Sequence, residues 1–171
     1  GAWNKLGSDI DGEAANDYSG YSVSLDSDGN RVAIGAIEND GSGDKAGHVR
    51  VYEYSSGAWN KLGSDIDGEA ANDYFGYSVS LDFDGDRVAI GAYANDGGGN
   101  NAGHVRLYEY SSGSWTQLGS DIDGEAANDY SGYSVSLASD GNRVAIGGRL
   151  NDGGGNNAGH VRLYEYSSGA W

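Results

Sequence analysis

The sequence predicts an all-β protein built from a repeated four-stranded antiparallel unit, and three observations support this prediction. Trp3, Trp59, Trp115 and Trp171 are each 56 residues apart, and the other landmark residues keep the same step. Short runs alternate apolar and polar residues, as β-strands do. Glycine, with 31 residues, recurs between these runs at regular positions, which indicates many tight turns. A fixed period of this length is the signature of a repeat architecture.

The central copy shows the strands of one unit in order. They are expected at residues 77–81, 87–92, 104–110 and 115–119. Asp84-Gly85 separates the first two strands and predicts a hairpin, because both residue types tolerate positive φ. Ser111-Ser112-Gly113 predicts the turn before the last strand. No helix is expected, since the Glu125-Ala126-Ala127 triplet is too short to form one.

Four-stranded antiparallel meanders that repeat along a chain are typical of β-propeller blades, with a solenoid as the alternative. We expect one propeller segment over residues 1–171, with three blades per chain and a ring completed by oligomerisation. The expected divisions are an outer strand within residues 1–16, blades at 17–72 and 73–128, and three strands of a last blade at 129–171.

The strand boundaries carry a recognisable motif. Phe75-Gly76 opens the first strand of the central copy, and Gly91-Ala92 closes its second strand. This pattern resembles the FG-GAP repeat, the blade of integrin α-subunit-type propellers and of many bacterial surface proteins. The first and third copies depart from it, with Ser19-Gly20 and Ser131-Gly132 in place of Phe-Gly. The resemblance implies that this strand is innermost, that the tryptophans lie near the outer edge, and that the parent protein is extracellular or at the cell surface.

The formal net charge of −16 argues against nucleic acid as a partner, because binding it requires a basic surface. No apolar stretch approaches the roughly 20 residues of a membrane helix, so membrane insertion is not expected. Divalent cations, basic ligands, and a protein or glycan ligand remain compatible with this composition.

The resemblance also implies a calcium loop between the first two strands, for which the candidate ligands are Asp82, Asp84 and Asp86. Ser80 and Val88 stand where two further ligands belong, although calcium requires six to eight oxygen ligands. We therefore expect a plain hairpin without a required cofactor, and weak or absent calcium binding as the outcome.

Acidic residues recur between the predicted blades, and one histidine recurs at the start of each third strand. We expect the carboxylates to accept backbone N–H groups and to pair with arginines of adjacent strands. The histidines are one blade apart and are expected to form hydrogen bonds in loops rather than a shared site. The residues are Asp9, Asp11, Glu13 and Asp17, then Asp65, Asp67, Glu69 and Asp73, then Asp121, Asp123, Glu125 and Asp129, with His48, His104 and His160.

The loops between the second and third strands differ most between copies, and variable loops on a fixed scaffold commonly carry binding. Drift in exposed turns is the alternative. The candidate ligand-binding residues of these loops are Asn39, Asp40, Asn95, Asp96, Asn151 and Asp152.

These observations predict a non-enzymatic propeller scaffold that serves in binding or adhesion. The alternative is a purely structural or engineered self-assembling fragment with no ligand. An enzyme is disfavoured, because near-identical copies offer no unique acid, base or nucleophile. The expected partner is a second copy of the chain, by strand exchange between chain ends, which gives a homodimer with six blades or a homotrimer with nine.

Overall fold

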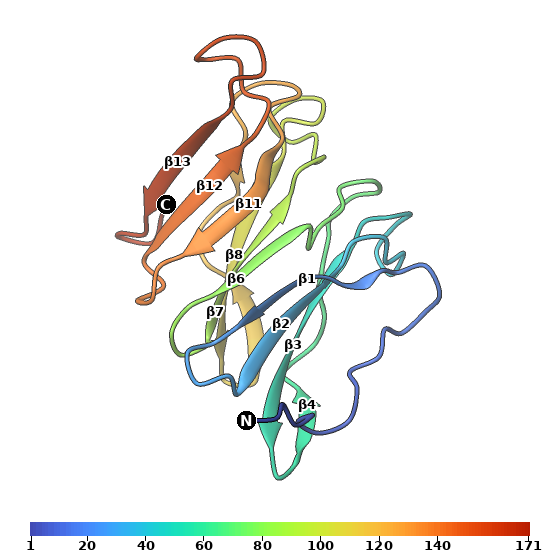
Figure 1. Cartoon of the computed structure of the whole chain (residues 1–171). Coiled ribbons are helices and arrows are strands. Elements are labelled where there is room, and N and C mark those ends of the chain that lie inside the picture. Colours follow the sequence, from blue (N-terminus) through green and yellow to red (C-terminus); the bar gives the residue numbers. More distant parts are fainter.

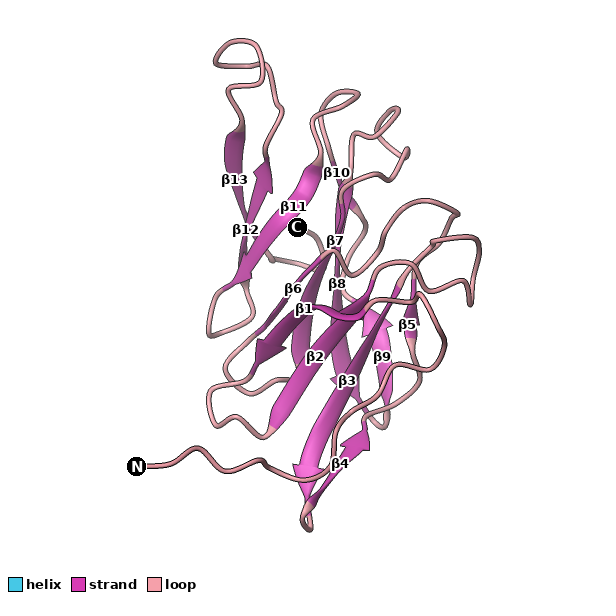
Figure 2. Ribbon diagram, turned by 45° about the vertical axis from the view of Figure 1, so that its right-hand side comes forward, coloured by secondary structure: helices cyan, strands magenta, loops and turns pink.

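The computed structural model describes all residues from 1 to 171 and contains strands but no helix (Figures 1 and 2). No helix able to cross a lipid bilayer is therefore present. The first sheet contains β1 (Ser19–Leu25), β2 (Arg31–Ala36), β3 (His48–Ser55), β4 (Ala58–Lys61) and β5 (Ile66–Asp67). The second contains β6 (Ser78–Leu81), β7 (Arg87–Ala92), β8 (His104–Ser111), β9 (Ser114–Gln117) and β10 (Ile122–Asp123). The third contains β11 (Ser131–Leu137), β12 (Arg143–Gly148) and β13 (His160–Glu165).

Each sheet is an antiparallel meander in chain order. In the first sheet the order is β1-β2-β3-β4, and β5 pairs with β3 as well. The outer strand of a blade is thus interrupted. The strand expected at residues 115–119 is present as β9 at 114–117, whereas the second outer segment, β10, was not expected. Gly119 has a φ of +77° and turns the chain out of the ladder between β9 and β10.

The Asp-Gly hairpin is confirmed, with a difference in its turn. Asp82 N donates to Arg87 O at 3.1 Å, so the loop between them has four residues rather than two. Only Gly85 adopts positive φ, at +67°, whereas Asp84 does not. The Asp82 side chain accepts the Arg87 N–H at 3.1 Å and holds the loop closed.

Apolar faces of neighbouring sheets form two cores, one between each pair of blades. The core between the first and second sheets contains Ala33, Val49, Val51, Ile66, Phe75, Leu81, Val88, Ile90 and Ala92. The core between the second and third contains Ala89, Val105, Leu107, Ile122, Leu137, Val144 and Ile146. The inner strands β1, β6 and β11 lie beside one another, while Trp59 and Trp115 are on the outer strands β4 and β9, as the resemblance implied.

Glycines set the distance between neighbouring sheets close to their inner strands. A Cβ on Gly35 would overlap the carbonyl oxygen of Gly76, and a Cβ on Gly91 would overlap that of Gly132. Serine hydroxyls reinforce this approach, because Ser22 donates to Gly76 O at 2.6 Å and Ser78 donates to Gly132 O at 2.8 Å. Only glycine permits the backbones to pack this closely.

The two ends of the stack differ from its interior. Residues 1–16 are identical in sequence to residues 57–72, which contain β4 and β5, yet 1–16 form no strand. Figure 2 shows this segment leaving the sheets as coil. Trp3 is fully exposed, whereas Trp115 packs against a core. The identical segment lacks a third strand to pair with, so its conformation differs because of tertiary context.

Gly85→Val tests the hairpin. We expect the free energy of unfolding to fall by more than about 1 kcal/mol, because a β-branched residue resists positive φ. A Cβ would also lie 2.9 Å from Arg31 Cδ of the neighbouring blade. The measurement is chemical denaturation.

Gly113→Val is the matched control for this substitution. Gly113 has a φ of +87° but faces open space, so it isolates the cost of the conformation. An unchanged stability for Gly85→Val would show that the inferred turn is wrong.

Candidate functional site

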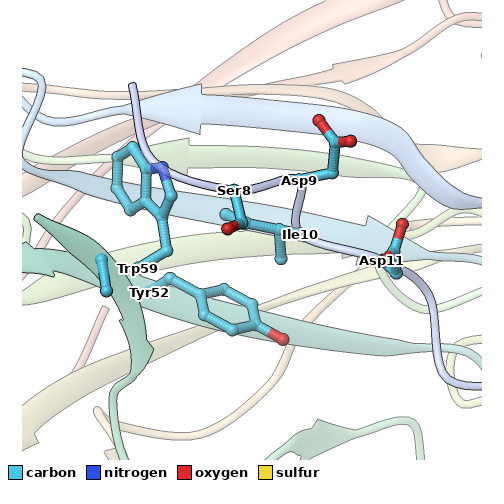
Figure 3. A pocket seen from close by; sticks show the side chains of 7 residues that line it. Ser8, Asp9, Ile10, Asp11, Tyr52 and Trp59 are labelled. Carbon is cyan, nitrogen blue, oxygen red and sulfur yellow. The ribbon is translucent and has the colours of Figure 1, made fainter. Parts of the chain in front are cut away.

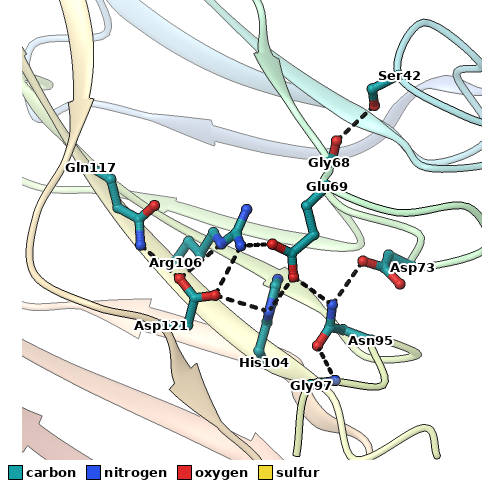
Figure 4. Close-up of polar contacts among 10 residues, drawn as sticks. All are labelled: Ser42, Gly68, Glu69, Asp73, Asn95, Gly97, His104, Arg106, Gln117 and Asp121. Carbon is teal, nitrogen blue, oxygen red and sulfur yellow. Dashed lines mark hydrogen bonds and ion pairs between the residues drawn. The ribbon is translucent and has the colours of Figure 1, made fainter.

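A polar cluster lies where the second blade meets the segment that precedes it (Figure 4). Glu69 follows β5, Arg106 lies on β8, and Asp121 stands just before β10. Arg106 Nε and Nη2 donate to the two oxygens of Asp121 at 2.9 and 2.8 Å, and Arg106 also pairs with Glu69. Gln117 donates to Asp121 Oδ1 at 2.6 Å. The guanidinium thus holds two carboxylates from different segments beside each other.

His104, the first residue of β8, lies inside this cluster. Its side chain is 1% exposed, and neither ring nitrogen has a hydrogen-bond partner. Nδ1 lies 3.7 Å from Glu69 Oε1 and 3.9 Å from Asp121 Oδ2. Burial, with the charge of Arg106, lowers the pKa of His104 to about 4. The ring is therefore neutral at pH 7, and the expectation of a hydrogen-bonded histidine is wrong at this position.

The first copy repeats the cluster with Glu13, His48, Arg50 and Asp65. In both copies the potential ligand atoms of the glutamate, histidine and aspartate lie within 4.8 Å of one another. The third copy has Glu125 and His160, 3.8 Å apart, but no aspartate beside them.

The expected pairing of the acidic residues with arginine is confirmed in this cluster. Burial acts to raise the pKa of Asp121, but hydrogen bonds from Arg106 and Gln117 outweigh it and lower the value. The convergence of glutamate, histidine and aspartate was missed by the sequence reasoning. The feature of the sequence that corresponds to this cluster is a repeated spacing. Glu13, His48 and Asp65 are separated by the same numbers of residues as Glu69, His104 and Asp121.

The hairpin candidates Asp82, Asp84 and Asp86 line one polar hollow of about 240 Å³ together with Arg87 and Glu109. Asp82 is buried, which raises the pKa of its carboxyl group, although the Arg87 N–H opposes this effect. Arg87 Nη2 pairs with Glu109 at 2.7 Å and places a positive charge at the hollow. The three aspartates are not among the groups whose ligand atoms converge within 4.8 Å.

The loop candidates divide into buried amides and exposed carboxylates. Asn39, Asn95 and Asn151 are buried, and each donates to an aspartate at 2.8 Å while its side-chain oxygen accepts a backbone N–H two residues ahead. Asp40, Asp96 and Asp152 are exposed and accept the N–H of residues 45, 101 and 157. The asparagines organise the loops, whereas the aspartates lie at the surface.

Comparison with known proteins relates this geometry to a family. Residues 65–108 match the FG-GAP repeat. This match confirms the resemblance on the second copy, which carries the Phe75-Gly76 and Gly91-Ala92 pairs. No curated protein matches the chain.

Solved structures of similar architecture support the propeller fold. One is described as a 6-phosphogluconolactonase from Bacteroides fragilis, with a TM-score of 0.55 and 13% identity over 85% of this chain and 34% of that one. Another is a periplasmic gluconolactonase from Pseudomonas aeruginosa, with a TM-score of 0.57 and 16% identity over 85% of this chain and 39% of that one. The chain therefore spans less than half of either propeller-like structure, and at such low identity the likeness concerns the fold alone.

The FG-GAP pattern has a direct physical meaning here. Gly76 follows Phe75 and has a φ of +90°, and its carbonyl faces Gly35, which belongs to the Gly-Ala pair of the preceding blade. Phe75 itself is fully buried in the core between the two blades. The motif thus encodes the contact between successive blades.

Tyrosines form a row across the inner strands of the three blades. The rings of Tyr21 and Tyr77 are 5.0 Å apart, and those of Tyr77 and Tyr133 are 4.8 Å apart. Two of the residues that vary between copies contact this row, since Tyr93 lies 4.4 Å from Tyr77 and Arg149 lies 4.6 Å from the Tyr133 ring. The row therefore combines a repeated aromatic surface with side chains that differ from blade to blade.

A hollow of about 310 Å³ lies beside the outer edge of the first blade (Figure 3). It is lined by residues 8–11 together with Tyr52, Ala58 and Trp59. Trp59 Nε1 donates to Leu6 O at 2.9 Å, as Trp115 does to Leu62 and Trp171 does to Leu118. In the second copy, Ile66, the equivalent of Ile10, is buried in a core. The hollow thus marks a place where the first copy lacks a neighbouring sheet.

The lowered pKa of His104 predicts that the protein becomes less stable as the pH falls. The prediction is made for protein in a solution that contains a chelator. The unfolded chain binds the proton below an ordinary pKa of 6.5, whereas the folded chain binds it only near pH 4. The contribution of His104 to the free energy of unfolding is therefore fully present above pH 6.5 and is lost as the pH is lowered. At pH 5 the loss from this group is about 2 kcal/mol. Glu69 and Asp121 oppose the shift, and Arg106 supports it.

Chemical denaturation of the parent chain and of His104→Gln, at pH 7.5 and at pH 5, measures this effect. We expect the variant to lose a large part of the pH dependence, because glutamine does not titrate. Val105→Ala controls for destabilisation alone, since it is a buried neighbour without a titratable group. Equal pH dependence in His104→Gln and parent would contradict the assignment.

Proposed function

We propose that the chain is a non-enzymatic β-propeller scaffold that assembles with further copies of itself by strand donation. The observation that carries this proposal is that the terminal blades expose the faces that the inner blade buries. Val161 and Leu163 on β13 are 65% and 75% exposed, whereas their equivalents Val105 and Leu107 are 0% and 1% exposed. Exposed apolar surface of this kind marks an interaction site.

The opposite end of the stack presents the complementary face. Leu25 of β1 is 59% exposed, whereas its equivalents Leu81 and Leu137 are buried in the two cores. Val23, on the same strand, is also exposed. A second copy that places its first blade on the third blade of this chain recreates the packing already present twice in the molecule.

Polar groups at these ends match in the same way. Ser80 Oγ accepts the Leu137 N–H at 2.9 Å, and Ser136 offers the equivalent hydroxyl to Leu25 of a second copy. Arg87 reaches Gly141 O at 3.3 Å, and the equivalent Arg143, which is 65% exposed, can reach Gly29 of a second copy. The same hydrogen bonds that join the inner blades are thus available between copies.

Strand donation completes the third blade. It has three strands, and residues 1–16 carry the sequence that forms the interrupted outer strand elsewhere. Pairing this segment with β13 of another copy removes a bare strand edge, which otherwise invites non-specific pairing. Head-to-tail contacts repeat until a ring closes. Two copies give six blades and three copies give nine.

Gly147→Ala tests the assembly. Gly147 is equivalent to Gly91, but within one chain a Cβ there meets only the hydroxyl of Ser134, which can rotate away. In the ring it would overlap Gly20 O of a second copy. We therefore expect a folded monomer, whereas the parent chain should appear as a dimer or trimer by native mass spectrometry.

Gly113→Ala is the control, because a Cβ there meets no atom within 4 Å, and the equivalent Gly57 and Gly169 are equally open. Deletion of residues 1–10 should also abolish assembly, since it removes the donated strand. A folded 17.7 kDa monomer as the main species of the parent chain would contradict the proposal.

Two features support a scaffold rather than an enzyme. The clusters around the histidines repeat from copy to copy, whereas catalysis requires a distinct acid, base or nucleophile at one place. The lactonases that share the fold are only 13% and 16% identical, so their activity does not transfer. FG-GAP repeats occur in extracellular and surface proteins, and we propose the same location for the protein to which this chain belongs.

The tyrosine row favours ligand recognition as a role for the scaffold. Tyr18 is 57% exposed and Tyr21 is 50% exposed. Tyr18 also lines a hollow with Asp40 and Lys45 of the first variable loop. Aromatic rings beside carboxylates suit the faces of sugar rings and basic peptides. A protein or glycan ligand is therefore the second part of the proposal, and a purely structural assembly is its alternative.

A screen of the assembled protein against glycans and basic peptides separates these two roles. We expect a ligand whose binding is weakened at least tenfold by Tyr93→Ser, since Tyr93 contacts both Tyr77 and Tyr133. Phe83→Ser is the control, because Phe83 is an exposed aromatic residue on a hairpin tip outside the row. Absence of any ligand would favour the purely structural role.

A further inference from the structure

We propose that the glutamate, histidine and aspartate of each blade junction bind a divalent transition metal ion, with zinc as the best match. The sites are Glu13, His48 and Asp65 in the first copy and Glu69, His104 and Asp121 in the second.

The unpartnered nitrogen of His104 is the first argument. A buried polar group without a hydrogen bond destabilises the folded state, because it has lost its contacts with water. The His104 side chain is 1% exposed, and Nδ1 faces one oxygen of Glu69 and one of Asp121, both too distant for a hydrogen bond. A metal ion between the three atoms would give Nδ1 its missing partner and offset the negative charge that Arg106 leaves on the two carboxylates.

The distances support a small tetrahedral ion. Zinc lies about 2.0–2.2 Å from nitrogen and oxygen ligands, so its ligands are about 3.3 Å apart. The Nδ1 atom is 3.7 and 3.9 Å from the two oxygens, which requires only small side-chain movements. Three protein ligands leave the fourth position of zinc for water. Calcium is disfavoured, because it prefers six to eight oxygen ligands and no imidazole.

The surrounding residues hold the ligand carboxylates in place. Each oxygen that faces His104 accepts one hydrogen bond, Glu69 Oε1 from Asn95 and Asp121 Oδ2 from Arg106, and a carboxylate oxygen keeps a second lone pair for a metal ion. Glu69 pairs with Arg106 through Oε2, which leaves Oε1 directed toward His104 and Asn95. Asp121 is held by Arg106 and by Gln117. Such outer hydrogen bonds orient carboxylate ligands in metal sites. The low pKa of His104 agrees with this arrangement, since only the neutral ring binds a metal.

A third site depends on the proposed assembly. Glu125 and His160 lie together in the third copy, but the aspartate equivalent to Asp65 and Asp121 is absent beside them. In a ring, Asp9 of the donated segment of a second copy would occupy that position. This part of the inference rests on the proposed function, whereas the first two sites lie within one chain.

Calorimetric titration of the chelator-treated, full-length protein with zinc chloride tests the proposal, and visible absorption of cobalt(II) reports tetrahedral coordination. We expect three ions per chain in the assembled parent and two in the Gly147→Ala monomer. The double variant Glu13→Gln/Glu69→Gln should weaken binding at the first two sites at least tenfold, because each site loses a ligand. Both glutamates are partly exposed, so folding should persist, as circular dichroism would verify.

Glu53→Gln/Glu109→Gln is the matched control. Both of these glutamates are 38% exposed and pair with an arginine, but neither belongs to a cluster. Two ions per chain in both parent and Gly147→Ala would support the sites within the chain and overturn the shared third site. The metal proposal fails if zinc does not bind, if calcium binds equally well, if the glutamate variants bind normally, or if only a water molecule occupies the cluster.

Discussion

The close approach of glycine backbones between neighbouring blades is the contact on which the rest of the structure depends. Gly35 lies against the carbonyl of Gly76, and Gly91 lies against that of Gly132. This spacing lets serine hydroxyls bridge the strands and lets Val49, Val51, Leu81 and Val88 fill one continuous core. One added methyl group would separate the sheets and weaken the van der Waals contacts of every residue in that core.

The same contact explains why identical sequences behave differently along the chain. A repeat buries its faces only when a neighbour is present on each side, so the stability of one blade is shared with the next. Residues 57–72 form strands because β3 lies beside them, whereas the identical residues 1–16 have no such partner. Local propensity therefore permits the outer strand, and tertiary pairing decides whether it forms.

Much of the fold follows from the sequence, because period and alternation are strong local signals. The strands of the central copy, the hairpin at Asp84-Gly85 and the absence of helix were all predicted. The interruption of the outer strand was not, since Gly119 gives no indication of its φ in the sequence. The pairing of carboxylates with arginine was predicted from residue type, but the position of His104 between them depends on three segments that meet only in the folded chain.

The blade junctions combine structural and chemical roles in a way that follows from repetition. Each junction needs a cation to hold carboxylates from successive segments, and Arg50 and Arg106 provide it. The histidine two residues earlier on the strand points to the same side of the sheet, because side chains alternate with a period of two. In the first two copies this spacing brings the imidazole to the same carboxylates that the arginine holds. Duplication of the repeat then multiplies the cluster, and closure of the ring would make its last copy a property of the assembly rather than of one chain.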